Sequence, residues 1–354
     1  MKDVRQTEVK LNQPTYQDVY SFSSLLAAFR KARRAKRGKG GEPEFYLDLE
    51  KNLLRLSQQL HDRSYWPDPY RYFPLRTPKR RVVSEASFRD RIVHHSLVGA
   101  LEPVFERRFV GTSYACRKNK GVHLALKDAR TAARRFPFFL KLDFEKYFDS
   151  IRHDVLFDLL RRPVSDDGIL WLCGLLMREA RVPGVEQDEC RGLPIGNLTS
   201  QFWANVYLDP LDQFARSLPG VCAYLRYMDD QLFFAEDKNV LWRALHAISD
   251  FAEQRLRLQL KTKATILAPV TEGIPWLGFR VFPGTVRLNH DSKVRFFRRL
   301  SASIGAAAES PWDEGDQVAR AASLCGHVTH ANSRALRRSV IRRHLRRQGS
   351  AHAE

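Results

Sequence analysis

The sequence has no apolar run long enough to cross a bilayer. Its longest apolar stretches, such as residues 136–140, are far shorter than the roughly 20 residues that a membrane helix needs. The N-terminus, which begins Met-Lys-Asp, has no apolar core of the kind that a signal peptide carries. We therefore expect a soluble, cytoplasmic protein with no membrane partner.

Cysteine is scarce, and no two of the five cysteines form a Cys-x-x-Cys pair. An odd, scattered set gives no zinc ribbon and fits a reducing compartment. One segment keeps a metal site open, because Cys325, His327 and His330 place three possible ligands within six residues. A fourth ligand at the usual spacing is missing.

Acidic residues are also in deficit, since 40 aspartates and glutamates face 59 lysines and arginines, which leaves a net charge of +19. Such a surplus predicts a polyanionic partner, and nucleic acid is favoured because a membrane partner would need an apolar anchor as well. The 44% of hydrophobic residues can form a large core in two or three subdomains, which excludes global disorder.

Apolar periodicity predicts helices at 17–36, 46–61, 89–102, 121–135, 153–161, 169–178, 199–214 and 239–256, with extended chain at 71–83. Strands are expected at 138–143, 221–227 and 231–235, and short strands around 276–279 are expected to close the same sheet. From about residue 283 the chain should be helical and basic. The seven basic residues between Arg30 and Lys39 are either a solvated helix end or a nucleic-acid contact.

Three aspartates are predicted to meet at one sheet edge. Alternation along 138–143 puts Lys141 and Asp143 on one face, and Asp229 and Asp230 lie at the tip of the hairpin formed by the next two strands. Like charges so close repel strongly unless divalent cations neutralise them. Two magnesium ions could activate a 3′-hydroxyl and stabilise a leaving pyrophosphate, so the pattern predicts nucleotidyl transfer.

The sequence resembles the reverse transcriptases, and the match runs through nearly the whole chain in the order of that family's motifs. The segments that carry it are 78–81 with 88–95, 141–148, 193–201, 227–230, 258–263 and 276–279. The resemblance implies an α+β right-hand polymerase fold with helical fingers, an antiparallel-sheet palm and a helical thumb. It implies an N-terminal helical extension and the start of the fingers at 1–75, fingers at 76–135, a palm at 136–282 with a helical insertion at 165–190, and a thumb at 283–354.

The resemblance also assigns the metal site. Asp143 and Asp229 would bind both magnesium ions together with the backbone carbonyl of Phe144, and Asp230 would assist. The activity implied is that of an RNA-directed DNA polymerase, with template RNA, cDNA and deoxynucleoside triphosphates as its partners.

Other matching residues would bind the incoming nucleotide. Lys79 and Arg81 would clamp the triphosphate, where multidentate cations suit phosphate oxygens. Either Lys261 or Lys263 could protonate the pyrophosphate, and their spacing does not choose between them.

Two further parts of this nucleotide site follow from the resemblance. Phe148 would stack under the sugar and exclude a 2′-hydroxyl, unless it is a core aromatic residue beside Tyr147. Ile195, Gly196 and Gln201 would form the glycine turn under the nucleotide.

Nucleic-acid contacts are implied at the catalytic hairpin and in the thumb. Tyr227 and Met228 belong to the hairpin. The segment 334–347 has seven arginines, no acid and apolar residues at helical spacing, so one face can pack while Arg334, Arg338 and Arg342 meet a backbone. A purely solvated basic helix is the alternative.

The segments 113–123, 195–201 and 323–331 are similar to the reverse transcriptases of diversity-generating retroelements. Most other reverse transcriptases carry glutamine where Ile195 stands and proline where Gln201 stands. An aliphatic residue removes a polar constraint from the pocket that selects the nucleotide, and in this group misincorporation falls opposite template adenines. The alternative for Ile195 is that it only packs the turn.

This closer resemblance implies mutagenic copying of a template-repeat RNA into cDNA that diversifies a target gene. It also implies a small basic accessory variability protein, a pentameric ring in that group, as a partner. Two other readings stay open, a retron-type or defence-associated bacterial reverse transcriptase and a non-catalytic RNA-binding protein on a polymerase fold.

Overall fold

The computed structural model describes residues 13–34, 37–38, 40–75, 81–180, 182, 184, 190–309, 322–326, 328–340 and 342. The chain forms two compact units. The first comprises the chain up to Gly111 with Phe144–Gln213 and Ser249–Gln259, and the second comprises Thr112–Asp143, Phe214–Ile248 and the chain from Leu260 onward. One of the crossings between the units comes directly after Asp143.

The first unit begins with four helices, α1 (Gln17–Tyr20), α2 (Phe22–Ala32), α3 (Glu42–Leu47) and α4 (Leu49–His61). The single helix predicted over 17–36 is interrupted at Ser21. The side chain of Ser21 accepts a hydrogen bond from the Ser24 amide and so caps the N-terminus of α2. In α2 the buried residues recur at intervals of three and four, which gives the helix one apolar face: Leu25, Ala28, Phe29 and Ala32.

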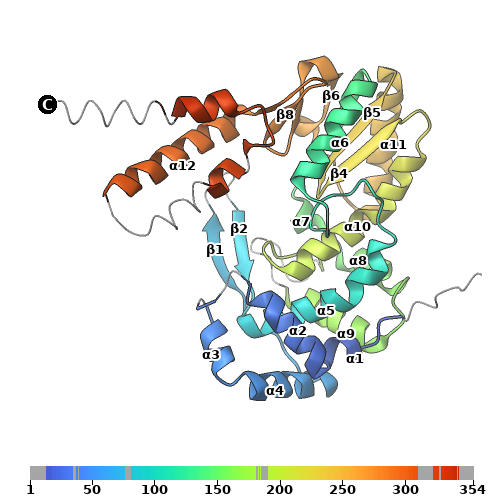
Figure 1. Ribbon diagram of the computed structural model, residues 1–354. Helices are drawn as coiled ribbons and strands as arrows, with labels where there is room; N and C mark the ends of the chain where they lie inside the picture. The colour runs from blue at the N-terminus through green and yellow to red at the C-terminus, as the bar shows by residue number, and fades with distance from the viewer. Residues whose placement is uncertain are drawn as a thin grey trace, which may run out of the picture. The chain divides into compact units, whose positions relative to one another are not determined.

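A hairpin and a long buried helix follow. Strands β1 (Arg71–Leu75) and β2 (Arg81–Glu85) pair antiparallel, so the segment predicted as extended is a hairpin. Helix α5 (Phe88–Glu106) is capped by Ser87, whose side chain accepts from the Asp90 amide, and it buries residues on every side. It is therefore the central helix of this part of the unit, as Figure 1 shows.

The rest of the first unit is helical, with α7 (Tyr147–Ser150), α8 (His153–Arg161), α9 (Asp167–Glu179) and most of α10 (Leu198–Ser217). The predicted helices at 153–161, 169–178 and 199–214 are confirmed to within a few residues. Helix α9 begins where Asp166 accepts a hydrogen bond of 3.0 Å from the Ile169 amide.

The second unit contains an antiparallel sheet in the order β4-β5-β3-β6. Its strands are β3 (Phe138–Leu142), β4 (Ala223–Tyr227), β5 (Asp230–Ala235) and β6 (Ile266–Pro269). Helix α6 (Val122–Arg135) crosses this sheet (Figure 1), and its alanine-rich face packs with residues of β3, β4 and β5 in one apolar cluster. Helix α11 (Lys238–Leu256) connects β5 to the first unit.

The prediction that strands around 276–279 close this sheet is wrong. Strands β7 (Ile274–Trp276), β8 (Phe279–Val281) and β9 (Val286–Leu288) form a separate three-stranded sheet. The fourth strand of the first sheet is β6, which pairs with β3 through Phe138↔Pro269 to Lys141↔Ile266. Trp276 and Phe279 still pack in the apolar cluster of α6, so the second sheet extends the same core.

From residue 290 onward, the described residues are largely helical. Helix α12 (His290–Glu309) contributes Phe296 and Leu300 to a small apolar cluster with Val328 and Val340. Short 3-10 turns, η2 (Thr262–Ala264) and η3 (Val270–Glu272), lie on either side of β6. The described residues thus form an α+β fold with antiparallel sheets, and no helix among them is long and apolar enough to span a membrane.

We predict that Gly168→Ala destabilises the first unit by about 1 to 3 kcal/mol, because a methyl group there would overlap the ring of Tyr16. Gly174→Ala in the same helix is the matched control, since its methyl group would lie 3.6 Å from Phe157 and should stabilise α9 by up to about 1 kcal/mol. Urea unfolding of both variants tests this, and equal stabilities would contradict it.

Candidate active site

The pairing of β3 with β5 brings two of the predicted aspartates to one end of the sheet. Leu142 pairs with Gln231, so Asp143, which follows Leu142, and Asp230, which precedes Gln231, are opposite each other at the end of the ladder. Residues opposite each other in an antiparallel pair share a face. The register thus places Asp143 and Asp230 at the same end of the sheet, and their role in a metal site stays a prediction.

The third aspartate lies in the tight turn of the β4–β5 hairpin. Tyr227 pairs with Asp230, which leaves Met228 and Asp229 as a two-residue loop. Met228 has a φ of +56°, a conformation that costs a side-chain-bearing residue free energy and that a turn of type II′ requires at its first loop position. Arg226, fully buried in β4, donates a hydrogen bond of 3.1 Å from Nη1 to the Met228 carbonyl.

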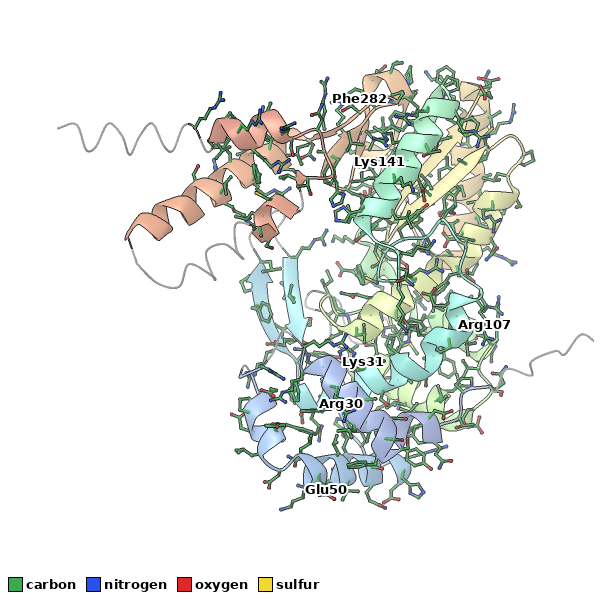
Figure 2. The ribbon with its side chains drawn as sticks, viewed as in Figure 1. Arg30, Lys31, Glu50, Arg107, Lys141 and Phe282 are labelled. Atoms are coloured by element: carbon green, nitrogen blue, oxygen red, sulfur yellow. The ribbon has the colours of Figure 1, made fainter. Side chains whose placement is uncertain are left out.

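A lysine on the same face holds one of these carboxylates. Lys141, labelled in Figure 2, has its Nζ 3.0 Å from Oδ1 of Asp230. The side chain of Lys141 is 16% exposed and that of Asp230 28%, so the pair is partly shielded from water. Sequence alternation placed Lys141 beside Asp143, but it did not indicate that this lysine neutralises Asp230.

The lysine motif lies against Asp143 through its backbone. The Lys261 amide donates a hydrogen bond of 2.8 Å to the Asp143 carbonyl, and Lys263 is an exposed residue of the turn η2. Both lysines therefore remain candidates for the group that would protonate the pyrophosphate. Of the two, Lys261 has the backbone hydrogen bond to Asp143.

The donor set at this edge suits a hard divalent cation. Carboxylate oxygens are the ligands that magnesium prefers. Within the described part of the chain, no group of three His, Cys, Asp or Glu side chains is arranged to hold an ion by itself. Asp143 and Asp229 are the residues to which the resemblance assigns this role, and Asp230 is paired with Lys141.

Tyr147 and Phe148, two adjacent aromatic residues of the first unit, differ in their burial. Tyr147 is 2% exposed and its hydroxyl donates to the Ala204 carbonyl at 2.6 Å, so it belongs to the core. Phe148 is partly exposed, and its carbonyl accepts from the Leu193 amide at 2.8 Å. The alternative that Phe148 is a core residue is therefore not favoured.

The predicted glycine turn packs against strand β2. The Ile195 carbonyl accepts a hydrogen bond of 2.8 Å from the Ser84 amide, and Gly196 follows with a φ of +118°. A Cβ atom on Gly196 would lie 2.8 Å from Val83 Cγ1 and 2.9 Å from the Ser84 carbonyl oxygen. Only glycine fits here without displacing β2. The Ile195 side chain is partly exposed, as is Gln201 in α10.

The other predicted binding residues are on the surface or outside the described residues. Arg81 begins β2 and is exposed, whereas Lys79 lies outside the described residues. Arg334, Arg338 and Arg342 are all exposed, and Val340 in the same segment is buried, as predicted for a helix with one packed face.

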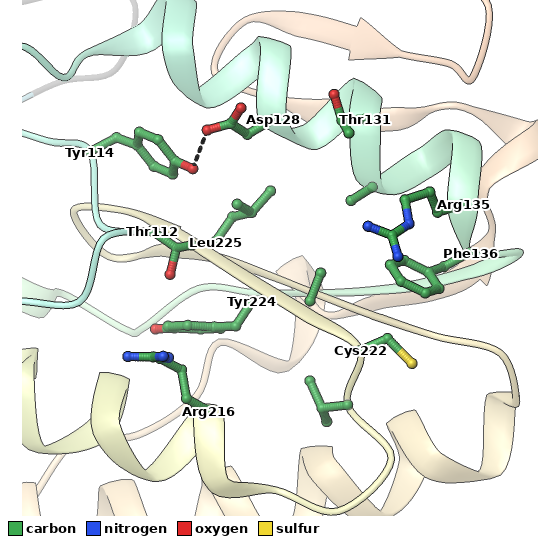
Figure 3. Close-up of a pocket in the computed structure, with 13 residues that line it drawn as sticks. Thr112, Tyr114, Asp128, Thr131, Arg135, Phe136, Arg216, Cys222, Tyr224 and Leu225 are labelled. Atoms are coloured by element: carbon green, nitrogen blue, oxygen red, sulfur yellow. Dashed lines mark hydrogen bonds between the residues drawn. The ribbon is translucent and has the colours of Figure 1, made fainter.

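The segment before α6 extends the catalytic hairpin. The Arg226 amide donates to the Thr112 carbonyl at 2.9 Å, and the Tyr114 amide donates to the Arg226 carbonyl at the same distance. Figure 3 shows the cavity of about 390 Å³ beside this junction, where the Tyr114 hydroxyl donates to Asp128 at 2.7 Å. At the start of the 113–123 motif, Ser113 thus forms an isolated parallel bridge with Arg226.

No metal site is found at Cys325 and His330 among the described residues, and His327 lies outside them. The ring of His330 stacks instead on that of His123, with 3.2 Å between the ring centroids. His330 therefore packs against the start of α6.

Comparison with known proteins identifies the family. The model of the reverse transcriptases (RNA-dependent DNA polymerases) matches residues 73–281, which is more than half of the chain. The chain belongs to the reverse transcriptase family. Its α+β fold is therefore the right-hand polymerase fold, and RNA-directed DNA polymerisation is its class of activity.

Individual relatives are distant. Protein YkfC of Escherichia coli is 26% identical over 275 residues, which cover 66% of this chain and 72% of YkfC. The group II intron-encoded protein LtrA of Lactococcus lactis is 26% identical over 173 residues, 48% of this chain and only 29% of LtrA. A structure of apo telomerase from Candida tropicalis aligns with a TM-score of 0.47 and 12% identity over 64% of this chain and 49% of that one.

We predict that Gly196→Ala lowers primer extension on an RNA template at least about tenfold, because the added Cβ must push β2 away from the turn. Gly121→Ala is the matched control. Its φ is also +118°, but no atom lies within 4 Å of its added Cβ, so it carries the backbone strain without the overlap. Equal losses in the two variants would show that strain alone accounts for the effect.

Proposed function

We propose that this chain is a reverse transcriptase of the kind found in diversity-generating retroelements. It would copy a template-repeat RNA into cDNA with errors at template adenines, and the cDNA would diversify a target gene. The observation that carries the proposal is the glycine turn. Its residue Ile195 is aliphatic, and the carbonyl of Ile195 accepts a hydrogen bond from strand β2.

The chemistry would be nucleotidyl transfer. Asp143 and Asp229, with the Phe144 carbonyl, would hold two magnesium ions, which supply activation of the 3′-hydroxyl and neutralisation of the leaving pyrophosphate. The ion pair between Lys141 and Asp230 supports a secondary role for Asp230. The ammonium of Lys141 beside Asp230 would lower the repulsion between that carboxylate and its acidic neighbours.

Nucleotide selection would fall to residues of the first unit. Lys79 and Arg81 would bind the triphosphate, and the exposure of Arg81 leaves its guanidinium available for that. The partly exposed ring of Phe148 would meet the sugar and exclude a 2′-hydroxyl. The backbone of this residue is anchored by the Leu193 amide, so the ring is presented from a fixed position.

The environment of Ile195 supports the proposal that the enzyme selects the incoming base weakly. Its carbonyl is fixed by Ser84, which sets the backbone of the turn, while its side chain is partly exposed and offers no hydrogen bond. Packing of the turn therefore does not depend on burial of the isoleucine side chain. A glutamine at this position would add a polar contact that the isoleucine cannot make.

Tyr227 and Met228 of the catalytic hairpin would bind nucleic acid. A thumb at 283–354 would add contacts through Arg334, Arg338 and Arg342. Fingers at 76–135 and a palm at 136–282 would complete the hand. The partner proteins would include a small basic accessory variability protein in a pentameric ring. Template RNA would then join two basic proteins.

A second candidate is a reverse transcriptase that serves a group II intron. It is favoured by the similarity to LtrA, a group II intron-encoded protein. The two functions differ in the expected errors, because only the retroelement enzyme should concentrate misincorporation at template adenines.

We predict that Asp229→Asn lowers primer extension on an RNA template at least about a hundredfold, because a lost metal ligand removes several kcal/mol of transition-state stabilisation. Affinity for the RNA should change by less than about twofold, since the exposed arginines remain. Glu253→Gln, at an exposed position of α11, is the control and should extend normally. Near-normal extension by a folded Asp229→Asn would overturn the proposed metal site.

We predict that Ile195→Gln improves discrimination at template adenine by about two- to tenfold, the worth of one added hydrogen bond of roughly 0.5 to 1.5 kcal/mol. Errors opposite the other template bases should change less. Sequencing of cDNA made by both proteins on one template decides this. An unchanged adenine error rate with intact extension would mean that infidelity arises elsewhere, and a flat error spectrum in the unaltered protein would favour the intron-type function.

A further inference from the structure

The ion pair between Lys141 and Asp230 follows from the register of the sheet in the second unit. Lys141 pairs with Leu232, and Asp230 lies two residues before Leu232 on β5. The two side chains therefore share a face as diagonal neighbours, a separation that a long side chain can span. Asp143 is opposite Asp230 at the end of the same ladder, so the ammonium of Lys141 reaches the carboxylate across from a predicted metal ligand.

The stem of Lys141 begins among apolar residues. Leu232, its partner across the ladder, is buried, and so is Phe139 on the same face of β3. The Lys141 side chain itself is only 16% exposed. Long cationic side chains pack their methylene groups on apolar surface and carry the charge to its margin. The ammonium of Lys141 is therefore held at the end of the ladder, unlike that of a surface lysine.

The oxygen that receives this ammonium is shielded from water. Oδ1 of Asp230 is buried, although the side chain as a whole is partly exposed, and it lies 3.0 Å from Lys141 Nζ. A charged oxygen that is removed from water needs an opposite charge beside it. Lys141 thus gives Asp230 the counter-charge that a divalent ion would otherwise supply.

A divalent cation would have to compete with that ammonium at the aspartate edge, which is the end of the sheet that carries Asp143, Asp229 and Asp230. To bind Asp230, the cation must displace Lys141 and so break a charge-assisted hydrogen bond. A cation on Asp143 and Asp229 alone would share the edge with a fixed positive charge, which repels it. Lys141 therefore neutralises a carboxylate and also weakens the affinity of this edge for metal.

We propose that Lys141 is a positioning residue, an internal counter-ion of Asp230 that keeps the aspartate edge weak for divalent cations until a nucleoside triphosphate arrives. The phosphates bring negative charge along with the metal, which offsets the positive charge of Lys141. The inference rests on the proposed function, because it assumes that Asp143 and Asp229 bind the metal ions. It adds that metal binds with the nucleotide rather than before it.

The test measures Mn²⁺ binding to the full-length protein without RNA, from the loss of the electron paramagnetic resonance signal of free Mn²⁺. Lys141→Met removes the charge and keeps a side chain of similar length, whereas Lys141→Gln removes the charge and keeps a hydrogen-bond donor. Lys141→Arg keeps the charge. Lys127→Met is the control for the loss of one positive charge, because Lys127 is an exposed residue of α6 in the same unit.

Lys141→Met and Lys141→Gln should bind Mn²⁺ at least about tenfold more tightly than the unaltered protein, the equivalent of one hydrogen bond to a charged group. A nucleoside triphosphate should raise the Mn²⁺ affinity of these two variants less than it raises that of the unaltered protein. Lys141→Arg and Lys127→Met should stay within about twofold of the unaltered protein, because the ion pair is kept in both.

Thermal unfolding supplies a readout that does not depend on activity. In EDTA both neutral variants should unfold at a lower temperature than the unaltered protein, because Asp230 has lost its counter-charge. Mg²⁺ should raise their unfolding temperature more than it raises that of the unaltered protein, since tighter binding to the folded state stabilises that state more.

An Asp230→Asn background shows whether Lys141 acts through Asp230. In that background the gain in Mn²⁺ affinity from Lys141→Met should fall below about threefold, because no carboxylate remains to be released. An undiminished gain would mean that Lys141 acts by repulsion alone, and its assignment as the counter-ion of Asp230 would be overturned.

Two further results would overturn the proposal. One is an equal Mn²⁺ affinity in the unaltered protein and in both neutral variants. The other is a loss of thermal stability in the neutral variants that Mg²⁺ does not reduce, which would make the ion pair purely structural.

The same measurement separates this inference from the proposed function. An Asp229→Asn variant that binds Mn²⁺ as tightly as the unaltered protein would refute the proposed metal site itself. A loss of affinity in Asp229→Asn, with no gain in the Lys141 variants, would keep that site and refute only the role of Lys141. Errors at template adenine, which test the diversification of a target gene, enter neither result.

Discussion

The register between β3 and β5 is the constraint on which the candidate active site depends. Leu142 and Gln231 face each other and are fully buried, and this pairing fixes Asp143 opposite Asp230. A slip of one residue would turn every side chain of β3 to the other face, so Lys141 and Asp143 would enter the apolar layer that Leu142 fills. Both faces of β3 are packed, since Leu140 and Leu142 are buried on one face and Phe139 is buried on the face of Lys141, so burial along the strand sets the position of the carboxylates at its end.

Two turns, one in each unit, solve the same backbone problem differently. The turn before α10 uses glycine at a φ of +118°, because a side chain there would collide with β2. The catalytic hairpin places Met228 at a φ of +56° and accepts the strain. Strain of this kind persists only where the surroundings hold the residue, and the buried Arg226 that donates to the Met228 carbonyl supplies such support. A rigid hairpin tip presents Asp229 in one orientation.

The sequence was informative wherever periodicity and motif agreed. The helices expected at 153–161, 169–178, 199–214 and 239–256 and the strands that lead to Asp143 and from Asp230 were predicted to within a few residues, because their apolar spacing matches their packing. Helix α5 extends four residues beyond its predicted end, and α7 was not predicted. The strand β6 was not predicted, since its four residues follow a lysine motif and have no clear alternation. The short strands around Trp276 were assigned to the wrong sheet, because pairing partners of three-residue strands are set by tertiary packing.

Contacts between residues that are far apart in the sequence could not be predicted from the sequence. Nothing in a lysine two positions before Asp143 indicates that it pairs with Asp230, and an arginine in a strand is ordinarily expected at the surface, whereas Arg226 is fully buried. The roles given to Phe148, Ile195 and the thumb arginines, and the domain limits, stay predictions.

Under the proposed function, affinity for nucleic acid and selection of the base would depend on different interactions. Under that function, the surplus of 19 positive charges would attract nucleic acid, and the exposed arginines Arg334 and Arg338 would contact phosphates without regard to sequence. Selection of the base would instead depend on the glycine turn, where the partly exposed side chain of Ile195 offers no hydrogen bond. Binding can therefore be strong while base selection is weak, because the two depend on separate residues. An enzyme that must hold its template firmly and still misread one base requires this separation.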